Sequence, residues 1–174
     1  MRSKLNRHKR LGTESGVTMI ELMIAGMVMV VGFLGMMVLI TTAIATNNRN
    51  KMETNATLAA QMVLEEIKSN YATGIIPVLT DCAGNNWTIA YAAGGAAGSG
   101  ATIDFTEASP PTNYFMNYTV CTANGGQATY DVRWRIQALT ANTSVVTVAS
   151  KTRGGSSDLK YFALPVVLRG YAGL

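Results

Sequence analysis

The sequence predicts an α+β protein in which a long N-terminal α-helix packs, by its C-terminal half, against a roughly four-stranded antiparallel sheet. Three observations lead to this expectation: a charge-free apolar run over residues 22–48, an amphipathic helical pattern up to residue 70, and alternating apolar and polar residues after residue 112. A chain of 174 residues has room for one modest globular domain in addition to such a helix.

The first segment, residues 1–16, is basic. The chain has 14 Lys and Arg against 10 Asp and Glu, and this segment holds five of the bases and one of the acids. Residues 17–174 therefore carry nine of each and have no net charge. We interpret the basicity as a topology signal that keeps the N-terminus in the cytoplasm and sends the remainder across the membrane. It is not the overall positive charge of a nucleic-acid-binding domain.

The second segment, residues 17–45, is predicted to be a membrane helix. It has no proline and is long enough to cross the roughly 30 Å hydrocarbon core of a bilayer. Glu21 stands at its N-terminal edge, and an ionisable residue in a membrane helix is a functional candidate by default. The alternative is an acid of the first helical turn that only interacts favourably with the helix dipole.

The third segment, residues 46–70, continues the helix in amphipathic form. Apolar residues recur at helical spacing and form one face of this segment, which consists of Ala56, Ala59, Ala60, Val63, Leu64 and Ile67. Residues 71–74 and then Pro77 predict the end of the helix. Because such a helix is not stable alone in water, its apolar face must be covered by something that follows it.

Residues 71–111 are predicted to be an irregular connection, and residues 112–174 to be the sheet. Residues 92–101 are too rich in small side chains to form a core of their own. Alternation predicts strands at 112–121, 130–138, 145–151 and 159–169, with a hairpin at Gly125-Gly126 and an edge position for the last strand because of Pro165. One face of this sheet needs a cover, and we expect residues 52–67 of the helix to provide it.

Two cysteines, Cys82 and Cys121, fall in the part of the chain that we expect outside the cytoplasm. A disulfide is the default in an oxidising compartment, although two separate thiols remain the alternative from sequence alone.

Arg133 and Arg135 alternate with the apolar residues of the strongest strand and form a candidate binding surface for DNA or for a partner protein. The alternative, which we favour, is the solvated face of an antiparallel sheet.

We do not expect an enzyme, a metal site or a cofactor. The single histidine, His8, lies in the basic first segment, so the remaining chain has no imidazole for acid–base catalysis or metal binding. Glu65 and Glu66 are neighbours on a helix and point apart.

Residues 16–22, Gly-Val-Thr-Met-Ile-Glu-Leu, resemble the class III signal of the type IV prepilin family, which reads as a glycine, a hydrophobic residue and then Thr-Leu-Ile-Glu-Leu. The sequence departs from it at Val17, where the family prefers Phe, at Met19, where it prefers Leu, and at Ser15, where a basic residue is common. Within the family, residues 30–37, 58–70 and 130–136 look most like PilV-type minor pilins.

This resemblance implies that a prepilin peptidase cleaves between Gly16 and Val17, removes residues 1–16 and N-methylates Val17. Glu21 would then neutralise the new N-terminus of an adjacent subunit during assembly. The implied partners are other pilin or pseudopilin subunits through the N-terminal helix, the inner-membrane assembly platform and the lipid bilayer. The implied location is the bacterial inner membrane, with the C-terminal domain in the periplasm, and afterwards an extracellular filament.

The expected function is therefore structural: a minor subunit of a type IV pilus-like filament. A minor pseudopilin of a type II secretion system is the alternative within the class, because it uses the same kind of helix and domain. A DNA- or surface-binding pilus-tip subunit is a second alternative, which depends on the arginines. A signal-anchored periplasmic enzyme is disfavoured by the missing imidazole.

Overall fold

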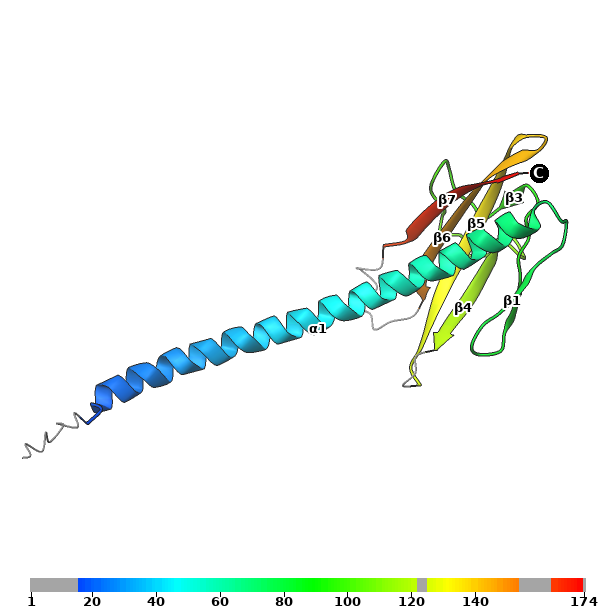
Figure 1. Ribbon diagram of the computed structural model, residues 1–174. Helices are drawn as coiled ribbons and strands as arrows, with labels where there is room; N and C mark the ends of the chain where they lie inside the picture. Colours follow the sequence, from blue (N-terminus) through cyan, green and yellow to red (C-terminus); the bar gives the residue numbers. More distant parts are fainter. Residues whose placement is uncertain (1–15, 122–124, 154–163, 174) are drawn as a thin grey trace, which may run out of the picture. The chain divides into compact units, whose positions relative to one another are not determined.

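The computed structural model describes residues 16–121, 125–153 and 164–173. The chain divides between Thr46 and Asn47 into two units, and each is described here by itself. Helix α1 (Met19–Asn70) supplies the first unit with its N-terminal part and the second with its C-terminal part, while all strands belong to the second unit (Figure 1).

In the first unit, α1 begins at Met19, two residues after the start of the predicted membrane segment, and it is helical through the rest of that segment. Every described side chain up to Thr46 is exposed, and none of the apolar window is buried. The helix is long and apolar enough to cross a membrane, as the sequence predicts.

The sheet of the second unit is an antiparallel meander of four strands with one short addition. The meander consists of β4 (Phe115–Cys121), β5 (Gln127–Thr140), β6 (Thr143–Arg153) and β7 (Val166–Gly173). The addition, β3 (Gly94–Gly95), pairs with β5 beyond the end of β4. A separate two-stranded sheet joins β1 (Val78–Thr80) to β2 (Asn86–Thr88).

The core of this unit lies between α1 and the sheet, as predicted. Five of the six residues of the predicted apolar helix face are buried, namely Ala56, Ala59, Ala60, Val63 and Ile67. They meet the inward face of β5, where Tyr130, Val132, Trp134 and Ile136 alternate with residues that point away. This confirms the α+β architecture and the predicted cover of the sheet.

The end of α1 is fixed on the sheet by Tyr71. Its hydroxyl forms a hydrogen bond of 2.7 Å with the hydroxyl of Ser144 on β6, and its ring packs edge-on against Tyr91. Gly74 adopts a left-handed conformation, φ 70°, and its amide donates to the carbonyl of Asn70. The helix therefore ends where the sequence predicts.

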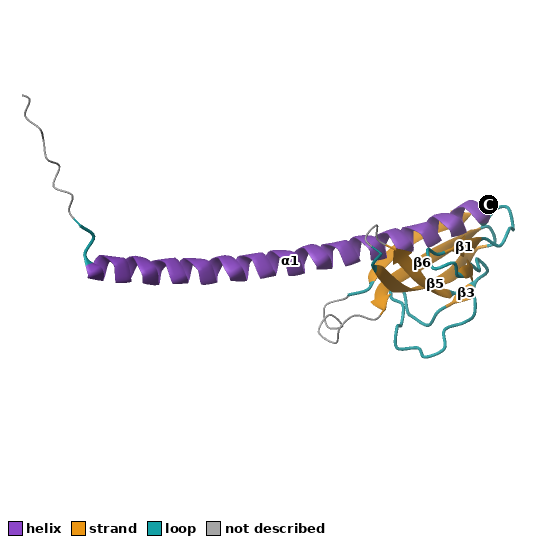
Figure 2. Cartoon of the chain, turned by 90° about the horizontal axis from the view of Figure 1, so that it is seen from below, coloured by secondary structure: helices purple, strands orange, loops and turns teal. Residues whose placement is uncertain are grey.

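The connection at residues 71–111 is more ordered than predicted, because it contains β1, β2 and β3. Gly95 has φ 125°, and a side chain there would overlap the backbone of Trp134 and Arg135. Small residues thus let the chain lie directly on β5. Ala96, Ile103 and Ala149 then form a second buried cluster, so the outer face of the sheet is also covered in this region, and Figure 2 shows loop on the side of the sheet away from the helix.

The predicted bounds of the fourth strand, 159–169, are partly wrong. Residues 159–163 lie outside the described residues, and Leu164 and Pro165 precede β7 and are exposed. The strand runs instead to Gly173. Within the described part of the chain β7 pairs only with β6, so the predicted edge position is correct although Pro165 is not in the ladder.

Candidate functional site

The N-terminus of α1 is capped by Thr18. The amide of Glu21 donates to the Thr18 hydroxyl at 3.3 Å, and the amide of Leu22 donates to the Thr18 carbonyl at 3.2 Å. Thr18 and Glu21 have the spacing of a capping box, which stabilises the first turn of a helix. This role of Thr18 comes from the structure, and it fixes Glu21 in the first turn of α1.

The predicted cleavage site, Gly16–Val17, lies immediately before this turn. Both residues are outside the helix, and the Val17 side chain is 70% exposed. A peptidase must bind its substrate in an extended conformation, and a peptide bond outside regular structure is accessible to it. Val17 thus lies two residues before the start of α1, and Glu21 lies in its first turn.

Behind Glu21, the apolar part of α1 has no polar group that lacks a partner in its own helix. The hydroxyls of Thr41, Thr42 and Thr46 donate to backbone carbonyls one turn earlier, at 2.8–3.0 Å. Such bonds allow hydroxyls to enter an apolar environment at little cost. Gly26, Gly32 and Gly35 face open space, so a neighbouring helix could approach closely there.

In the second unit, Cys82 and Cys121 form a disulfide with 5.9 Å between their Cα atoms. The pairing that the sequence favoured is confirmed. The bridge joins the turn after β1 to the end of β4.

Asp81 is a buried acid that the sequence analysis missed. One carboxylate oxygen accepts from the amides of Ala83 and Asn85, at 3.0 and 2.8 Å. The other accepts from the Asn85 amide group, the Trp87 indole and the Thr119 amide, at 3.0, 3.3 and 3.4 Å. Burial raises the pKa of Asp81, but these hydrogen bonds outweigh it and hold the pKa below its ordinary value of 3.8.

The signal for this role was present in the sequence. An aspartate followed by Gly84 and Asn85 is typical of a turn in which the carboxylate accepts from nearby amides. Gly84 has φ 85°, as that turn requires. Alternation patterns do not register such a residue, because it belongs to a turn.

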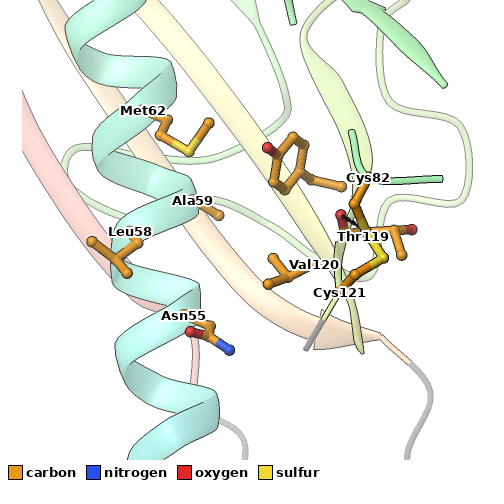
Figure 3. A pocket seen from close by; sticks show the side chains of 9 residues that line it. Asn55, Leu58, Ala59, Met62, Cys82, Thr119, Val120 and Cys121 are labelled. Carbon is orange, nitrogen blue, oxygen red and sulfur yellow. Dashed lines mark hydrogen bonds between the residues drawn. A yellow bond between two sulfur atoms is a disulfide. The ribbon is translucent and has the colours of Figure 1, made fainter. Parts of the chain in front are cut away.

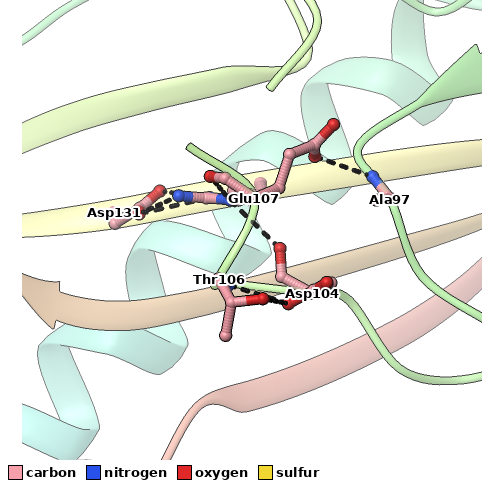
Figure 4. Close-up of polar contacts among 6 residues, drawn as sticks. Ala97, Asp104, Thr106, Glu107 and Asp131 are labelled. Carbon is pink, nitrogen blue, oxygen red and sulfur yellow. Dashed lines mark hydrogen bonds and ion pairs between the residues drawn. The ribbon is translucent and has the colours of Figure 1, made fainter. Parts of the chain in front are cut away.

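Arg133 and Arg135 do not form the exposed basic surface considered above. Arg133 is 7% exposed and is paired with Asp131 at 2.8 Å on the same face of β5. Its guanidinium also donates to the carbonyls of Asp104 and Glu107, both at 3.0 Å (Figure 4). It lies over the ring of Phe105, 5.1 Å from the ring centroid. Arg135 is partly buried and donates to the carbonyl of Gly98.

Both arginines therefore hold the connecting loop onto the outer face of the sheet. The expectation of a solvated face is also wrong at this place, because the loop covers it. Exposed bases elsewhere on the described part of the sheet include Arg153 and Arg169.

A groove of about 260 Å³ lies between α1 and β4 (Figure 3). Asn55, Leu58 and Met62 line it from the helix, and Tyr118, Val120 and the disulfide line it from the sheet side. The residues that line the groove include no carboxylate, imidazole, ammonium or free thiol. Among the described residues, no group of three His, Cys, Asp or Glu lies close enough together to hold a metal ion.

Comparison of the sequence with protein-family models gives no match, and comparisons with curated proteins and with solved structures give none either.

Proposed function

We propose that this chain is a structural, minor subunit of a type IV pilus-like filament, made as a membrane-inserted precursor and assembled after removal of residues 1–16. The observation that carries the proposal is Glu21. It is the acid of the first turn of α1, it follows an accessible Gly16–Val17 bond, and it precedes a charge-free apolar stretch of the helix that is exposed within the described residues.

The apolar surface of the first unit supports assembly through this helix. A protein stable in water does not expose so many large apolar side chains in one continuous segment. Lipid would cover them before assembly, and the equivalent helices of other subunits would cover them afterwards. The precursor would therefore reside in the inner membrane, with its second unit in the periplasm.

Glu21 would have an electrostatic function in the assembled polymer. Cleavage creates an α-ammonium on Val17, and N-methylation retains its positive charge. Where helices pack together without water, an unpaired ammonium is strongly unfavourable, and a carboxylate from a neighbouring subunit would compensate it. The capping of the helix by Thr18 holds Glu21 near the end of the helix where this charge would lie.

The second unit fits a role outside the cytoplasm, because a disulfide persists in an oxidising compartment. The partners in this proposal are a prepilin peptidase, the inner-membrane assembly platform and other subunits of the filament. The DNA-binding alternative loses its proposed surface, since Arg133 and Arg135 are engaged within the fold.

The processing step is testable by mass spectrometry of the protein isolated from membranes of a cell that produces the peptidase. We expect a mature chain beginning with N-methylated Val17. A Gly16→Leu variant should remain uncleaved yet be inserted in the membrane, because the required small residue is lost and the apolar helix is unchanged.

Gly26→Leu is the matched control, since Gly26 also faces open space but lies inside the helix. Its precursor should be cleaved as in wild type. A mature N-terminus at Met1, or one beyond residue 45, would contradict the proposed processing.

A further inference from the structure

The outer edge of β7 is the open edge of the main sheet. Within the described residues, β7 has one strand partner, β6, and its other side forms no backbone hydrogen bond with another segment. The opposite edge differs, because β4 is bonded by the connecting segment: the amide of Cys82 donates to the Thr119 carbonyl, and the Asp81 carboxylate accepts from the Thr119 amide. Figure 1 shows β7 at the margin of the sheet.

The two faces of β7 have different character. Val166, Leu168 and Ala172 point toward the core, and Gly170 lies against Leu64 of α1. The residues between them point to the outer face: Val167 is 39% exposed, Tyr171 is 69% exposed, and Arg169 is also exposed. On the outer face, the basic Arg169 therefore lies between the apolar Val167 and Tyr171.

Arg169 has no ion-pair partner among the described residues. A second copy of this strand, added antiparallel around a two-fold axis, would place two Arg169 side chains close to each other. Like charges on neighbouring strands are destabilising. An incoming strand would instead complement all three exposed residues if it placed an acidic side chain opposite Arg169. The next side chains on the same face of that strand, two residues before and two residues after the acid, would be apolar.

We propose that the outer edge of β7 binds an extended segment of a partner protein by β-strand addition, and that this segment presents an acidic residue opposite Arg169 between two apolar residues. Main-chain hydrogen bonds with alternate residues of β7 supply affinity, and the three outer side chains supply specificity. Pro165 has no amide hydrogen, so the added strand pairs no further than Val166 at that end. This inference does not depend on the filament proposal.

Another interpretation is that Arg169 only protects the edge against aggregation, as charged residues on edge strands often do. That interpretation requires no preference for an acidic strand. The two interpretations therefore differ in a measurable way.

The test uses the full chain in detergent micelles and two capped, fluorescent heptapeptides of alternating threonine and valine. One has glutamate at its centre and the other has lysine. Fluorescence anisotropy should show tighter binding of the glutamate peptide, by about threefold to tenfold, because an opposite-charge cross-strand pair replaces a like-charge pair. Bound peptide should also slow hydrogen exchange of the β7 amides.

The variant Arg169→Glu should reverse this preference, so that the lysine peptide binds more tightly. Arg153→Glu makes the same change of charge at an exposed position beyond the β6–β7 ladder, and it should leave the preference unchanged. Binding of neither peptide would overturn the proposal, as would an unchanged preference in Arg169→Glu. Self-association of Arg169→Ser without peptide binding would also overturn it, in favour of the protective role.

These outcomes leave the processing at Val17 untouched. Failure here is therefore distinguishable from failure of the proposed function.

Discussion

At the scale of single residues, Asp81 is a buried acid with many hydrogen-bond partners in the second unit. Five N–H groups donate to its carboxylate, and they come from the turn after β1, from β2 and from β4. A carboxylate is acceptor-only, so no neutral isostere can satisfy all five donors. Asp81 therefore determines how the β1–β2 sheet sits on β4.

We predict that Asp81→Asn lowers the free energy of unfolding at pH 7 by about 1–3 kcal/mol, because an amide group would face hydrogen-bond donors. Since the folded pKa lies below 3.8, wild-type stability from this group is complete above that pH and is lost as the pH falls through the folded pKa. The difference between wild type and variant should thus shrink in acid. Urea unfolding between pH 2.5 and 7 measures it.

Asp104→Asn is the matched control for this experiment. The pKa of Asp104 is also lowered, by hydrogen bonds from Thr106, yet its side chain is exposed. Little change in stability is expected there. An Asp81 variant as stable as wild type at pH 7 would show that the turn forms without the charged acceptor.

At the scale of elements, the β1–β2 sheet is fixed to β4 by covalent and non-covalent contacts. The disulfide joins Cys82 to Cys121, and the Cys82 amide donates to the Thr119 carbonyl at 3.4 Å. In addition, Trp87 and Leu79 pack against the main core from this small sheet. The disulfide therefore adds stability to an arrangement that other contacts already define.

We predict that the double variant Cys82→Ser, Cys121→Ser keeps its secondary structure and loses up to about 4 kcal/mol of unfolding free energy, the chain-entropy value for a loop of this length. Circular dichroism and urea unfolding of the variant, beside reduced wild type as the control, provide the measurement. Loss of the β signal at low denaturant would mean that the bridge defines the fold of this region.

The elements that could be predicted from sequence are those with a long periodic pattern. Helix α1 has an apolar run followed by an amphipathic segment with one apolar face. In β5, apolar and polar residues alternate from Tyr130 to Ile136. Strands β1 to β3 have two or three residues each, which is too short for a periodic signal.

The environment of Arg133 could not be predicted for a different reason. Alternation correctly placed it on the outer face of β5, but it does not show what covers that face. The cover is a loop 26–29 residues earlier in the chain, which is a non-local contact. The same holds for Asp81, whose contact with Thr119 spans 38 residues. The position of Glu21 at the start of the helix could be predicted because its signal is local.

At the scale of the whole molecule, the two units have opposite surface character. The second has a core of its own, formed by α1 and the sheet. The first, where the structure describes it, is an apolar helix whose side chains are exposed, and the ionisable group in its first turn is Glu21. We propose that this surface serves assembly in addition to membrane insertion.

The most direct test of that claim is to compare Glu21→Ala with wild type in membrane and sheared-filament fractions by quantitative blotting. Insertion depends on total apolarity, so the variant should be processed and membrane-embedded as wild type is. Loss of the acid would leave the ammonium of a neighbouring subunit without a partner, at a free-energy cost of about 3–5 kcal/mol per buried contact. The variant should therefore be absent from filaments.

Glu53→Ala is the control, because it removes the same charge from an exposed i, i+4 pair with Arg49 in the second unit. That variant should reach the filament fraction. If Glu21→Ala enters filaments as well as wild type does, then Glu21 serves only the first turn of the helix, and the assembly role proposed for it is contradicted.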